Sequence, residues 1–320
     1  MKKKFTLLLL SVLLLASCAK KSYPVSAYRR EMKYHDDFTI MQFTDIHIGS
    51  ESDIEDVLSL LNDEINYETT NYHKPDLIVM TGDNFTNASK AIINRAISYY
   101  DSWNIPFALT YGNHDFQGSY DRFYIADQLR KTENAVFVDY DDDDIYGQAN
   151  YYINLKSNNE TEYRVYIIDS NSYMQRGIKM NYDIIHEDQL QHIDDICKEE
   201  GKVPGLAFYH IPVYEFKDAY NLYLEGKIEG KGENHEGVSY GYKRNDAFKR
   251  MKDDGVIGMF VGHDHINDTS LLYQDVLLSY GVKSTGEIYH EKIGYTRIKL
   301  HGQDKLSLDD VDKVIYKDAE

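Results

Sequence analysis

The chain has 320 residues, of which 42% are hydrophobic and 28% charged, enough material for one large α/β domain or two small ones. Its formal net charge is −18. Such an acidic surface repels polyanions, so a nucleic-acid polymer is not expected as a partner. A small anionic substrate is compatible with this charge if bound cations invert the local potential.

The N-terminus combines three lysines, Lys2 to Lys4, with an apolar stretch from Phe5 to Ala16. This stretch is too short to span a bilayer comfortably, so it predicts an export signal and not a transmembrane helix. The segment LASC, residues 15–18, resembles a bacterial lipoprotein box, in which the cysteine is lipidated and becomes the first residue of the mature chain. The resemblance implies a signal peptide over residues 1–17 and a lipid anchor at Cys18, on an extracytoplasmic face of a bacterial membrane. An ordinary signal peptide or an uncleaved anchor is the alternative.

The hydrophobic pattern divides the rest of the chain into three parts. Residues 18–36 show no sustained period and are interpreted as a linker. A domain is expected over residues 37–305 and a C-terminal tail over residues 306–320. Apolar runs of strand length in the domain are Phe38 to Phe43, Leu77 to Met80, Ile105 to Leu109, Tyr163 to Ile168, Gly205 to Tyr209, Val256 to Val261, Val276 to Leu278 and Tyr295 to Leu300.

Amphipathic stretches between several of these runs predict helices. The first begins with Ser52 and Glu55 as a capping box. The others are expected at about 88–100, 187–200 and 244–254. Alternating strands and helices indicate an α/β fold with a mostly parallel sheet covered on both faces. In such sheets, ligand-binding side chains gather where the strands end.

Three further stretches are interpreted by composition. The run DYDDDD, residues 139–144, lacks the spaced ligands and the turn glycine of a calcium loop, so a solvated turn is expected. Residues 214–242 are rich in Gly, Glu, Lys and Tyr with little core pattern, which indicates an access loop. Cys197 is the only cysteine besides Cys18, so no intrachain disulfide is expected once Cys18 is modified.

Metal-ligating residue types directly follow five of the predicted strands. They occur in TDIH, TGDN, YGNHD, FYHIP and VGHDH, and they are Asp45, His47, Asp83, Asn113, His114, His210, His263 and His265. A single histidine after a strand is usually structural. Five of the twelve histidines beside carboxylates and an amide are hard to explain as packing, because burying ionisable groups without partners costs several kcal/mol. Divalent cations would supply the partner.

The expected ligands are nitrogen and oxygen atoms without a thiolate, which favours Mn, Fe, Zn or Co. Seven side chains are too many for one ion and suit two divalent ions. A carboxylate such as Asp83 can bridge a pair, and ions roughly 3.5–4 Å apart clamp the attacking and leaving oxygens of an in-line displacement. The glycines before Asp83, Asn113 and His263 allow sharp turns and keep Cβ atoms away from the ligands.

The order D-x-H, G-D, G-N-H-D, H, G-H-x-H resembles the calcineurin-like metallophosphoesterase superfamily, over residues from about 37 to 300. GNHD, HIP and GHDH most resemble its purple-acid-phosphatase-like branch. The resemblance implies a four-layer α/β/β/α sandwich with two mixed central sheets. It also implies that Asp83 bridges two metals, one held by Asp45, His47 and His265 and the other by Asn113, His210 and His263.

The resemblance further implies that His114 lies outside the metal ligands, near the phosphoryl oxygen and the leaving group. Asp115 is expected to orient either His114 or the loop by hydrogen bonds; a turn-stabilising carboxylate is an equal alternative. Purple acid phosphatases carry a tyrosine three residues after the bridging aspartate, where this chain has Thr86, and His47 stands at a position that they leave to glycine. A colourless enzyme is therefore expected.

The leading hypothesis is hydrolysis of a small phosphorylated substrate, a phosphomonoester or phosphodiester, by a metal-activated hydroxide, with His114 assisting. The alternative is a non-catalytic surface lipoprotein that binds a phosphorylated ligand through the same metals. A metallopeptidase or lactamase-type hydrolase is disfavoured because HExxH and HxHxDH are both absent. A monomer is expected. Substrate choice must come from loops such as 214–242 and 171–186, because the fold does not set it.

Overall fold

The computed structural model describes residues 21–120, 123–286, 292–302 and 304–318. The signal peptide expected over residues 1–17 and the lipid anchor at Cys18 lie outside the described residues. Among the helices of the described part, none has the length and apolar character needed to cross a bilayer.

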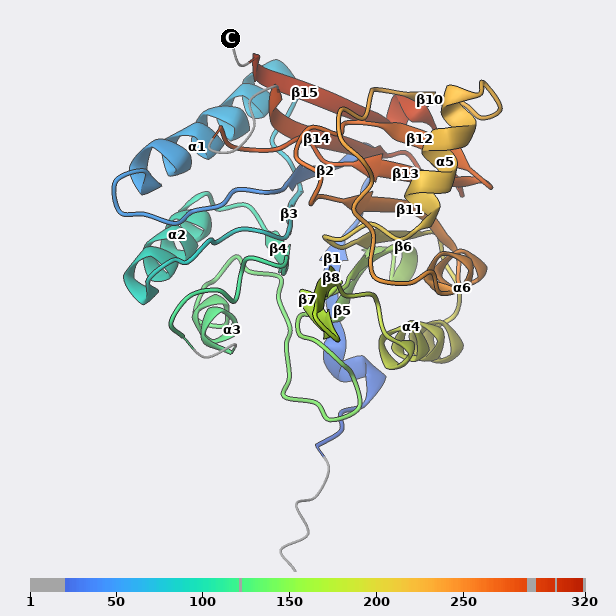
Figure 1. Cartoon of the computed structure of the whole chain (residues 1–320), viewed down its shortest axis with the longest axis horizontal. Helices are drawn as coiled ribbons and strands as arrows, with labels where there is room; N and C mark the ends of the chain where they lie inside the picture. Colours follow the sequence, from blue (N-terminus) through green and yellow to red (C-terminus); the bar gives the residue numbers. More distant parts are fainter. Residues whose placement is uncertain (1–20, 121–122, 287–291, 303, 319–320) are drawn as a thin grey trace, which may run out of the picture.

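Two mixed β-sheets form the centre of the fold (Figure 1). The five-stranded sheet has the order β15 (Val311–Asp318), β14 (Lys292–Leu300), β2 (Phe38–Phe43), β3 (Leu77–Thr81), β4 (Phe107–Thr110). The eight-stranded sheet has the order β1 (Arg29–Lys33), β5 (Tyr151–Ser157), β6 (Glu160–Ile167), β9 (Gly205–Phe208), β11 (Val256–Val261), β13 (Val276–Tyr280), β12 (Ser270–Tyr273), β10 (Gly230–Lys231). A separate hairpin pairs β7 (Tyr173–Arg176) with β8 (Lys179–Tyr182).

Helices cover the outer faces of the two sheets, which gives four layers (Figure 1). On the side of the five-stranded sheet lie α1 (Ile54–Asn71), α2 (Lys90–Ser102) and α3 (Tyr124–Leu129). On the side of the eight-stranded sheet lie α4 (Glu187–Glu200), α5 (Glu215–Leu224) and α6 (Ala247–Asp253). Short 3-10 turns are η1 (Val25–Tyr28) and η2 (Leu308–Asp310). The α/β/β/α sandwich with two mixed sheets is therefore confirmed.

Each apolar run of strand length corresponds to an observed strand, and in β2, β3 and β4 every residue is buried. Such fully buried strands are what parallel pairing between two covered faces requires. The capping box at the start of α1 was wrong, because Asp53 is the N-cap residue and makes no side-chain cap bond. Ser89 does cap α2, with its hydroxyl accepting a bond from Ile92 N at 3.3 Å.

Both predicted boundaries of the domain were wrong. The linker expected over residues 18–36 contains η1 and β1, and β1 pairs in parallel with β5 at the edge of the large sheet. The tail expected over residues 306–320 contains η2 and β15, which pairs antiparallel with β14. These edge strands read RREMK and VDKVIYKD, and their charged residues, typical of sheet edges, leave no apolar run longer than three residues.

The acidic run at residues 139–144 is not simply a solvated turn. The carboxylate of Asp143 accepts a bond from the backbone N–H of Lys21 at 2.7 Å, and that of Asp142 accepts one from Tyr23 N at 3.3 Å. The hydroxyl of Tyr28 also donates to Asp142. The run therefore fixes the N-terminal segment on the domain. Residues 214–242, expected to be a loop, begin with α5 and include β10.

Candidate metal centre

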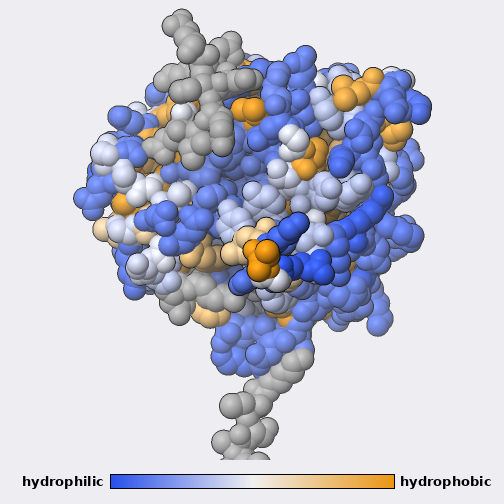
Figure 2. All heavy atoms as spheres, in the orientation of Figure 1, coloured by the Kyte–Doolittle hydropathy of each residue, from blue (hydrophilic) through white to orange (hydrophobic). Residues whose placement is uncertain are grey.

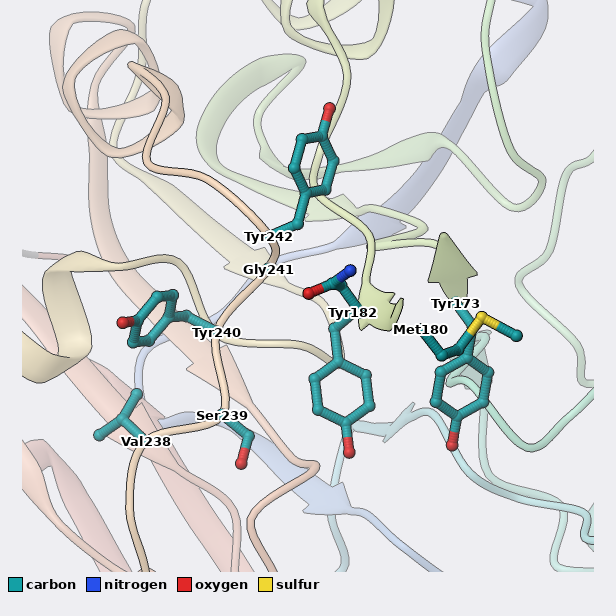
Figure 3. A pocket seen from close by; sticks show the side chains of 9 residues that line it. Tyr173, Met180, Tyr182, Val238, Ser239, Tyr240, Gly241 and Tyr242 are labelled. Atoms are coloured by element: carbon teal, nitrogen blue, oxygen red, sulfur yellow. The ribbon is translucent and has the colours of Figure 1, made fainter. Parts of the chain in front are cut away.

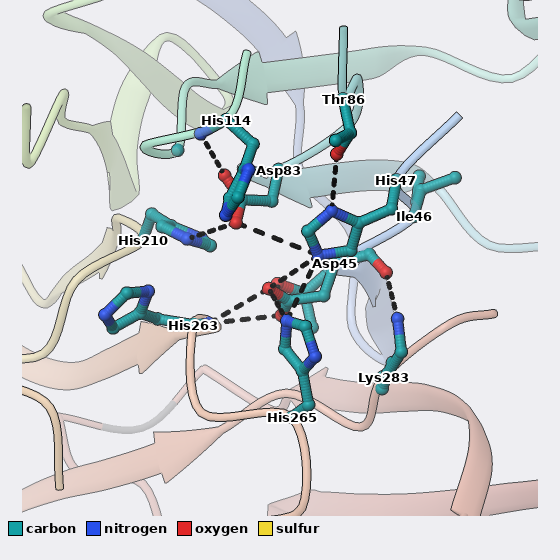
Figure 4. A network of polar contacts seen from close by, with 12 residues as sticks. Asp45, Ile46, His47, Asp83, Thr86, His114, His210, His263, His265 and Lys283 are labelled. Atoms are coloured by element: carbon teal, nitrogen blue, oxygen red, sulfur yellow. Dashed lines mark hydrogen bonds and ion pairs between the residues drawn. The ribbon is translucent and has the colours of Figure 1, made fainter. Parts of the chain in front are cut away.

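The carboxyl ends of five strands, from both sheets, meet at one place, and the predicted ligands follow them directly (Figure 4). Two groups of side chains have ligand atoms within 4.8 Å of one another. They share Asp83 and consist of Asp45, His47, Asp83 and His265, and of Asp83, His210 and His263. Residues up to about two hundred positions apart therefore converge, as the motifs predicted.

The backbone at these strand ends is in the left-handed region, which is rare for residues other than glycine. The φ angles are 54° at Asp45, 55° at His47, 50° at Asp83 and 78° at His263. Conformations of this kind cost of order 1–3 kcal/mol each and persist where the surrounding structure enforces them, often at functional sites. Four such residues in one cluster indicate that an unfavourable backbone conformation is maintained because it directs these side chains toward one another.

Glycines make room for the ligands. A Cβ atom on Gly112 would lie 2.2 Å from Asp83 Oδ1, and one on Gly262 would lie 2.7 Å from Asp45 Oδ2. Gly82 has a φ of 88°, and a Cβ there would lie 2.7 Å from His210 Nδ1. The expected role of glycine before Asp83, Asn113 and His263 is confirmed by this geometry.

A methyl group at Gly112 is expected to displace the Asp83 carboxylate. The Gly112→Ala variant should lose about 1–3 kcal/mol of unfolding free energy, as overpacked sites do, and should bind divalent cations more weakly. Thermal denaturation with and without added Mn²⁺ measures both effects. Gly237→Ala is the matched control, because nothing lies within 4 Å of a Cβ there. Equal denaturation curves for the two variants would contradict the assignment.

The first group brings acceptor atoms unusually close together. His47 Nε2 and His265 Nε2 are 3.1 Å apart, and His265 Nε2 is 3.4 Å from Asp45 Oδ1. His47 Nε2 is also 3.8 Å from Asp83 Oδ2. Two imidazole nitrogens and two carboxylate oxygens this close together form the nitrogen and oxygen ligand set that a divalent cation takes.

The second group lies on the other side of Asp83. His210 Nε2 is 3.1 Å from Asp83 Oδ2, and the His210 and His263 rings have centroids 5.0 Å apart. Asn113 Oδ1 and His263 Nε2 are buried and have no hydrogen-bond partner among the described residues. A buried acceptor without a partner is costly, and a cation bound by these atoms removes that cost. Asp83 stands between the two groups, as a bridging ligand must.

The charges in the cluster suit cation binding. Burial opposes ionisation of Asp83 and Asp45, but His210 and His265 outweigh it and hold both carboxyl pKa values below their usual range. Burial lowers the pKa of His47 and of His263 to about 3, so both imidazoles are neutral at physiological pH. For His210, the carboxylate of Asp83 outweighs burial and raises the pKa to about 10. A divalent ion binding here would replace that proton.

Hydrogen bonds outside the cluster set the orientation of three ligands. His210 Nδ1–H donates to Thr81 O at 2.9 Å, which leaves Nε2 facing Asp83. Asn113 Nδ2 donates to Tyr173 OH at 2.9 Å, which leaves Oδ1 as the ligand atom. His47 Nδ1 lies 2.7 Å from Thr86 Oγ1, so the tautomer with its proton on Nδ1 leaves Nε2 free for a metal. Such partners fix ring orientation and ligand basicity.

This geometry explains a departure that the sequence left open. Thr86 stands where purple acid phosphatases have tyrosine, and its hydroxyl orients His47, the other departure from that branch. Lys283 is a further residue that sequence reasoning missed: it is buried and donates through Nζ to Asp45 O at 2.9 Å. No ligand motif includes Lys283, so no local pattern indicates this contact.

Replacing Thr86 by valine keeps the shape of the side chain and removes the hydroxyl. Because outer partners of metal ligands are typically worth about 10–100-fold in metal affinity, Thr86→Val should weaken binding of one ion by that factor. Titration of the metal-free protein with Zn²⁺ or Mn²⁺ in a calorimeter measures it. Thr132→Val is the control, since its hydroxyl donates to Leu129 O away from the cluster. An unchanged metal affinity in Thr86→Val would contradict the proposed role of Thr86 in orienting His47.

His114 lies at the open side of the cluster, half-buried, with its ring centroid 5.3 Å from that of His47. Its backbone N–H donates to Asp83 Oδ1 at 2.8 Å, and its Nδ1 lies 2.9 Å from Gln117 Oε1. Neither contact makes it a metal ligand, which agrees with the role expected for it. Gln117 is a residue that sequence reasoning missed. It contacts Nδ1 of His114 and thereby orients the ring, and it makes no contact with Nε2.

Asp115 does not face the cluster. Its side chain is fully buried and accepts bonds from Gly112 N at 2.7 Å and from Phe85 N at 2.9 Å. Among the described residues, the donors to this carboxylate are Asn84, Phe85 and Gly112, and His114 is not one of them. Of the roles considered, the structure shows the loop-stabilising one, and the assignment of Asp115 to the catalytic residues beside His114 was wrong. The carboxylate links the loop after β3 to the loop after β4 and so fixes the positions of Asp83 and Asn113 relative to each other.

Two facing mixed sheets with a histidine and aspartate cluster at their shared strand ends define an α/β protein with a candidate cation site. The chain belongs to the calcineurin-like phosphoesterase family, whose model matches residues 38–267.

Relatives agree with the purple-acid-phosphatase-like branch. The chain is 31% identical to probable inactive purple acid phosphatase 29 of Arabidopsis thaliana, over 87% of this chain and 80% of that protein. It is 28% identical to phosphatase DCR2 of Saccharomyces cerevisiae, over 73% of this chain and 45% of that longer protein. Among solved structures, TT1561 of Thermus thermophilus aligns with a TM-score of 0.44 and 10% identity, over 77% of this chain and 90% of that one.

Proposed function

We propose that this chain is an active hydrolase of phosphate esters that depends on two divalent cations. The observation that carries the proposal is the buried Asn113 Oδ1, which lacks a hydrogen-bond partner among the described residues while Tyr173 holds the other end of the amide. Asp45, His47 and His265 would hold one ion, Asn113, His210 and His263 the other, with Asp83 shared. All are nitrogen and oxygen donors, which suits Mn, Fe, Zn or Co.

When bound, the cations supply a nucleophile at neutral pH by lowering the pKa of water, and they offset charge on the phosphoryl oxygens. The chain's own residues position the ester and protonate its leaving group. Asp83 and Asp45 bring negative charge that only cations make compatible with an anionic ester. His114, held by Gln117 and beside His47, can donate a proton from Nε2 to the departing oxygen.

The competing proposal is a non-catalytic lipoprotein that binds a phosphorylated ligand through the same metals. It is favoured by the word "inactive" in the name of the plant relative. Against it stands His114, which no metal needs and which Gln117 nevertheless holds in place beside the cluster. An oriented proton donor beside the metals is what protonation of a leaving group requires.

Turnover separates the two proposals. The purified chain, loaded separately with Mn, Fe, Zn or Co, is incubated with a chromogenic phosphomonoester and a chromogenic phosphodiester. We expect hydrolysis of at least one ester, lost on chelation and restored by metal, without the colour that a tyrosine ligand gives to ferric iron. Two bound ions per chain without turnover of any ester would support the binding protein instead.

We further propose that the chain is anchored outside the cytoplasm by lipid at Cys18, which the LASC segment supports. A Cys18→Ser variant should fail to incorporate a labelled fatty acid and should leave the membrane fraction of the producing cells. Cys197→Ser is the control, because that thiol is buried in α4. Labelling that persists in Cys18→Ser would overturn the anchor.

A further inference from the structure

A cavity of about 540 Å³ opens beside the metal centre, between the β7–β8 hairpin and residues 238–242. Its volume lies within the range of small-molecule sites, roughly 300–1,000 Å³. Nine described residues line it, and none of them is acidic or basic. The lining residues that matter most here are Tyr173, Met180, Asn181, Tyr182, Ser239 and Tyr240 (Figure 3).

The cavity shares its wall with the metal centre. Tyr173 OH accepts the bond from Asn113 Nδ2 at 2.9 Å, and the Tyr182 ring stands edge-on to the His263 ring with centroids 4.3 Å apart. Two proposed ligands of the same ion therefore border the cavity. When the phosphoryl group of an ester is bound by the cations, the leaving group of that ester lies next to this cavity.

The walls present aromatic rings from two sides. Tyr173 and Tyr182 are cross-strand neighbours with centroids 5.5 Å apart and planes 30° apart, and their hydroxyls point the same way (Figure 3). Tyr240 comes from the opposite segment, where its ring packs edge-on against Tyr214. Met180 is 65% exposed and Tyr173 40%, although the face seen in Figure 2 is mostly hydrophilic. Exposed apolar groups gathered at a cavity are typical of a ligand site.

This lining suits one kind of occupant. Tyrosine rings stack on flat rings, and the hydroxyls of tyrosine and Ser239 and the amide of Asn181 bond to polar atoms at a ring's edge. An acidic or basic group in the occupant would find no counter-charge among the lining side chains. Arg176 lies 4.7 Å from the ring centroid of Tyr242 and Lys217 lies 5.3 Å from that of Tyr240, so each of these two rings already has a cation over one face.

We propose that this cavity binds the leaving group of a phosphate ester and that this group is an uncharged flat ring, either an aryl alcohol or a nucleoside. The inference rests on the proposed function for the position of the phosphoryl group. It makes the β7–β8 hairpin and residues 238–242 the elements that select the substrate.

The test compares kcat/KM for phenyl phosphate and adenosine monophosphate, which carry rings, with that for glycerol phosphate, which does not. Tyr240→Ala removes one wall without touching a proposed metal ligand. It should lower the ratio of ring ester to glycerol ester about tenfold, the size of one stacking contact. Met180→Ala should lower the ratio in the same direction. Ile178→Ala is the matched control, because Ile178 lies on the same hairpin, is fully exposed and does not line the cavity. The larger loss, on phenyl or on adenosine ester, identifies the source of the ring.

A second measurement needs no turnover. Saturation-transfer NMR with adenosine and with phenol should show contact to the metal-loaded chain and to Ile178→Ala, and a weakened signal with Tyr240→Ala. Ring binding without hydrolysis of any ester would defeat the proposed function and leave the cavity assignment standing. Ester ratios and NMR signals that Tyr240→Ala and Met180→Ala leave unchanged, in folded protein, would overturn the cavity assignment and leave the hydrolase standing.

Discussion

Asp83→Asn is expected to lose at least one of its two metal ions and, with it, turnover. The substitution keeps the shape of the side chain and an oxygen that accepts the bond from His114 N, but it removes the negative charge between the two groups. Loss of an outer partner alone costs about 10–100-fold in affinity, so loss of the shared ligand should cost on the order of a hundredfold or more. Elemental analysis after dialysis, together with kcat on the chromogenic ester, measures both effects.

The matched control is Asp63→Asn, an exposed aspartate on α1, which should keep both ions and full activity. Circular dichroism should show that Asp83→Asn stays folded, since the asparagine removes a buried charge that needs a partner. An Asp83→Asn protein that retains two tightly held ions after dialysis would defeat the assignment of Asp83 as the shared ligand.

His114→Ala is expected to lose turnover but keep both ions, unlike Asp83→Asn, which should lose metal and turnover together. Alanine keeps the backbone N–H that bonds Asp83, so the cluster is not disturbed, whereas the proton donor at the leaving oxygen is gone. A well-placed acid contributes on the order of 10²–10⁴-fold, and kcat should fall within that range. The loss should be smaller for esters with a good leaving group, which needs less help from a proton.

Two variants make the His114 result specific. Gln117→Ala removes the group that holds Nδ1 and should cause a smaller loss of kcat, while His35→Ala, an exposed histidine bonded to Asp76, should change nothing. Metal loss in His114→Ala would mean that the ring holds an ion. A kcat equal to that of the unaltered protein would remove His114 from the chemistry.

The sequence predicted the strands that carry the ligands because those strands are buried on both faces and read as apolar runs. β2, β3 and β4 are buried at every position, and the ligand motifs follow each of them within a few residues. Parallel strands bring such ends to one edge, so convergence of Asp45, Asp83 and Asn113 followed from chain order alone. Gly112 and Gly262 lie against Asp83 and Asp45 because the ligand side chains crowd this edge and leave no room for a Cβ atom.

Other parts could not be predicted, for physical reasons. Strands β1 and β15 lie at sheet edges, where charged residues are tolerated and the apolar pattern disappears. The partners Thr86, Tyr173 and Gln117 act through single hydrogen bonds that only the tertiary structure reveals. Asp115 was misjudged because its place in the GNHD motif does not show that its side chain turns into the protein.

Anomalous diffraction from crystals grown with Mn²⁺ or Zn²⁺ tests the central claim most directly. Two anomalous peaks roughly 3.5–4 Å apart should appear, with the Asp83 carboxylate between them and Asn113 Oδ1 and His263 bound to one of the two ions. A single peak, or two peaks that do not share Asp83, would contradict the account.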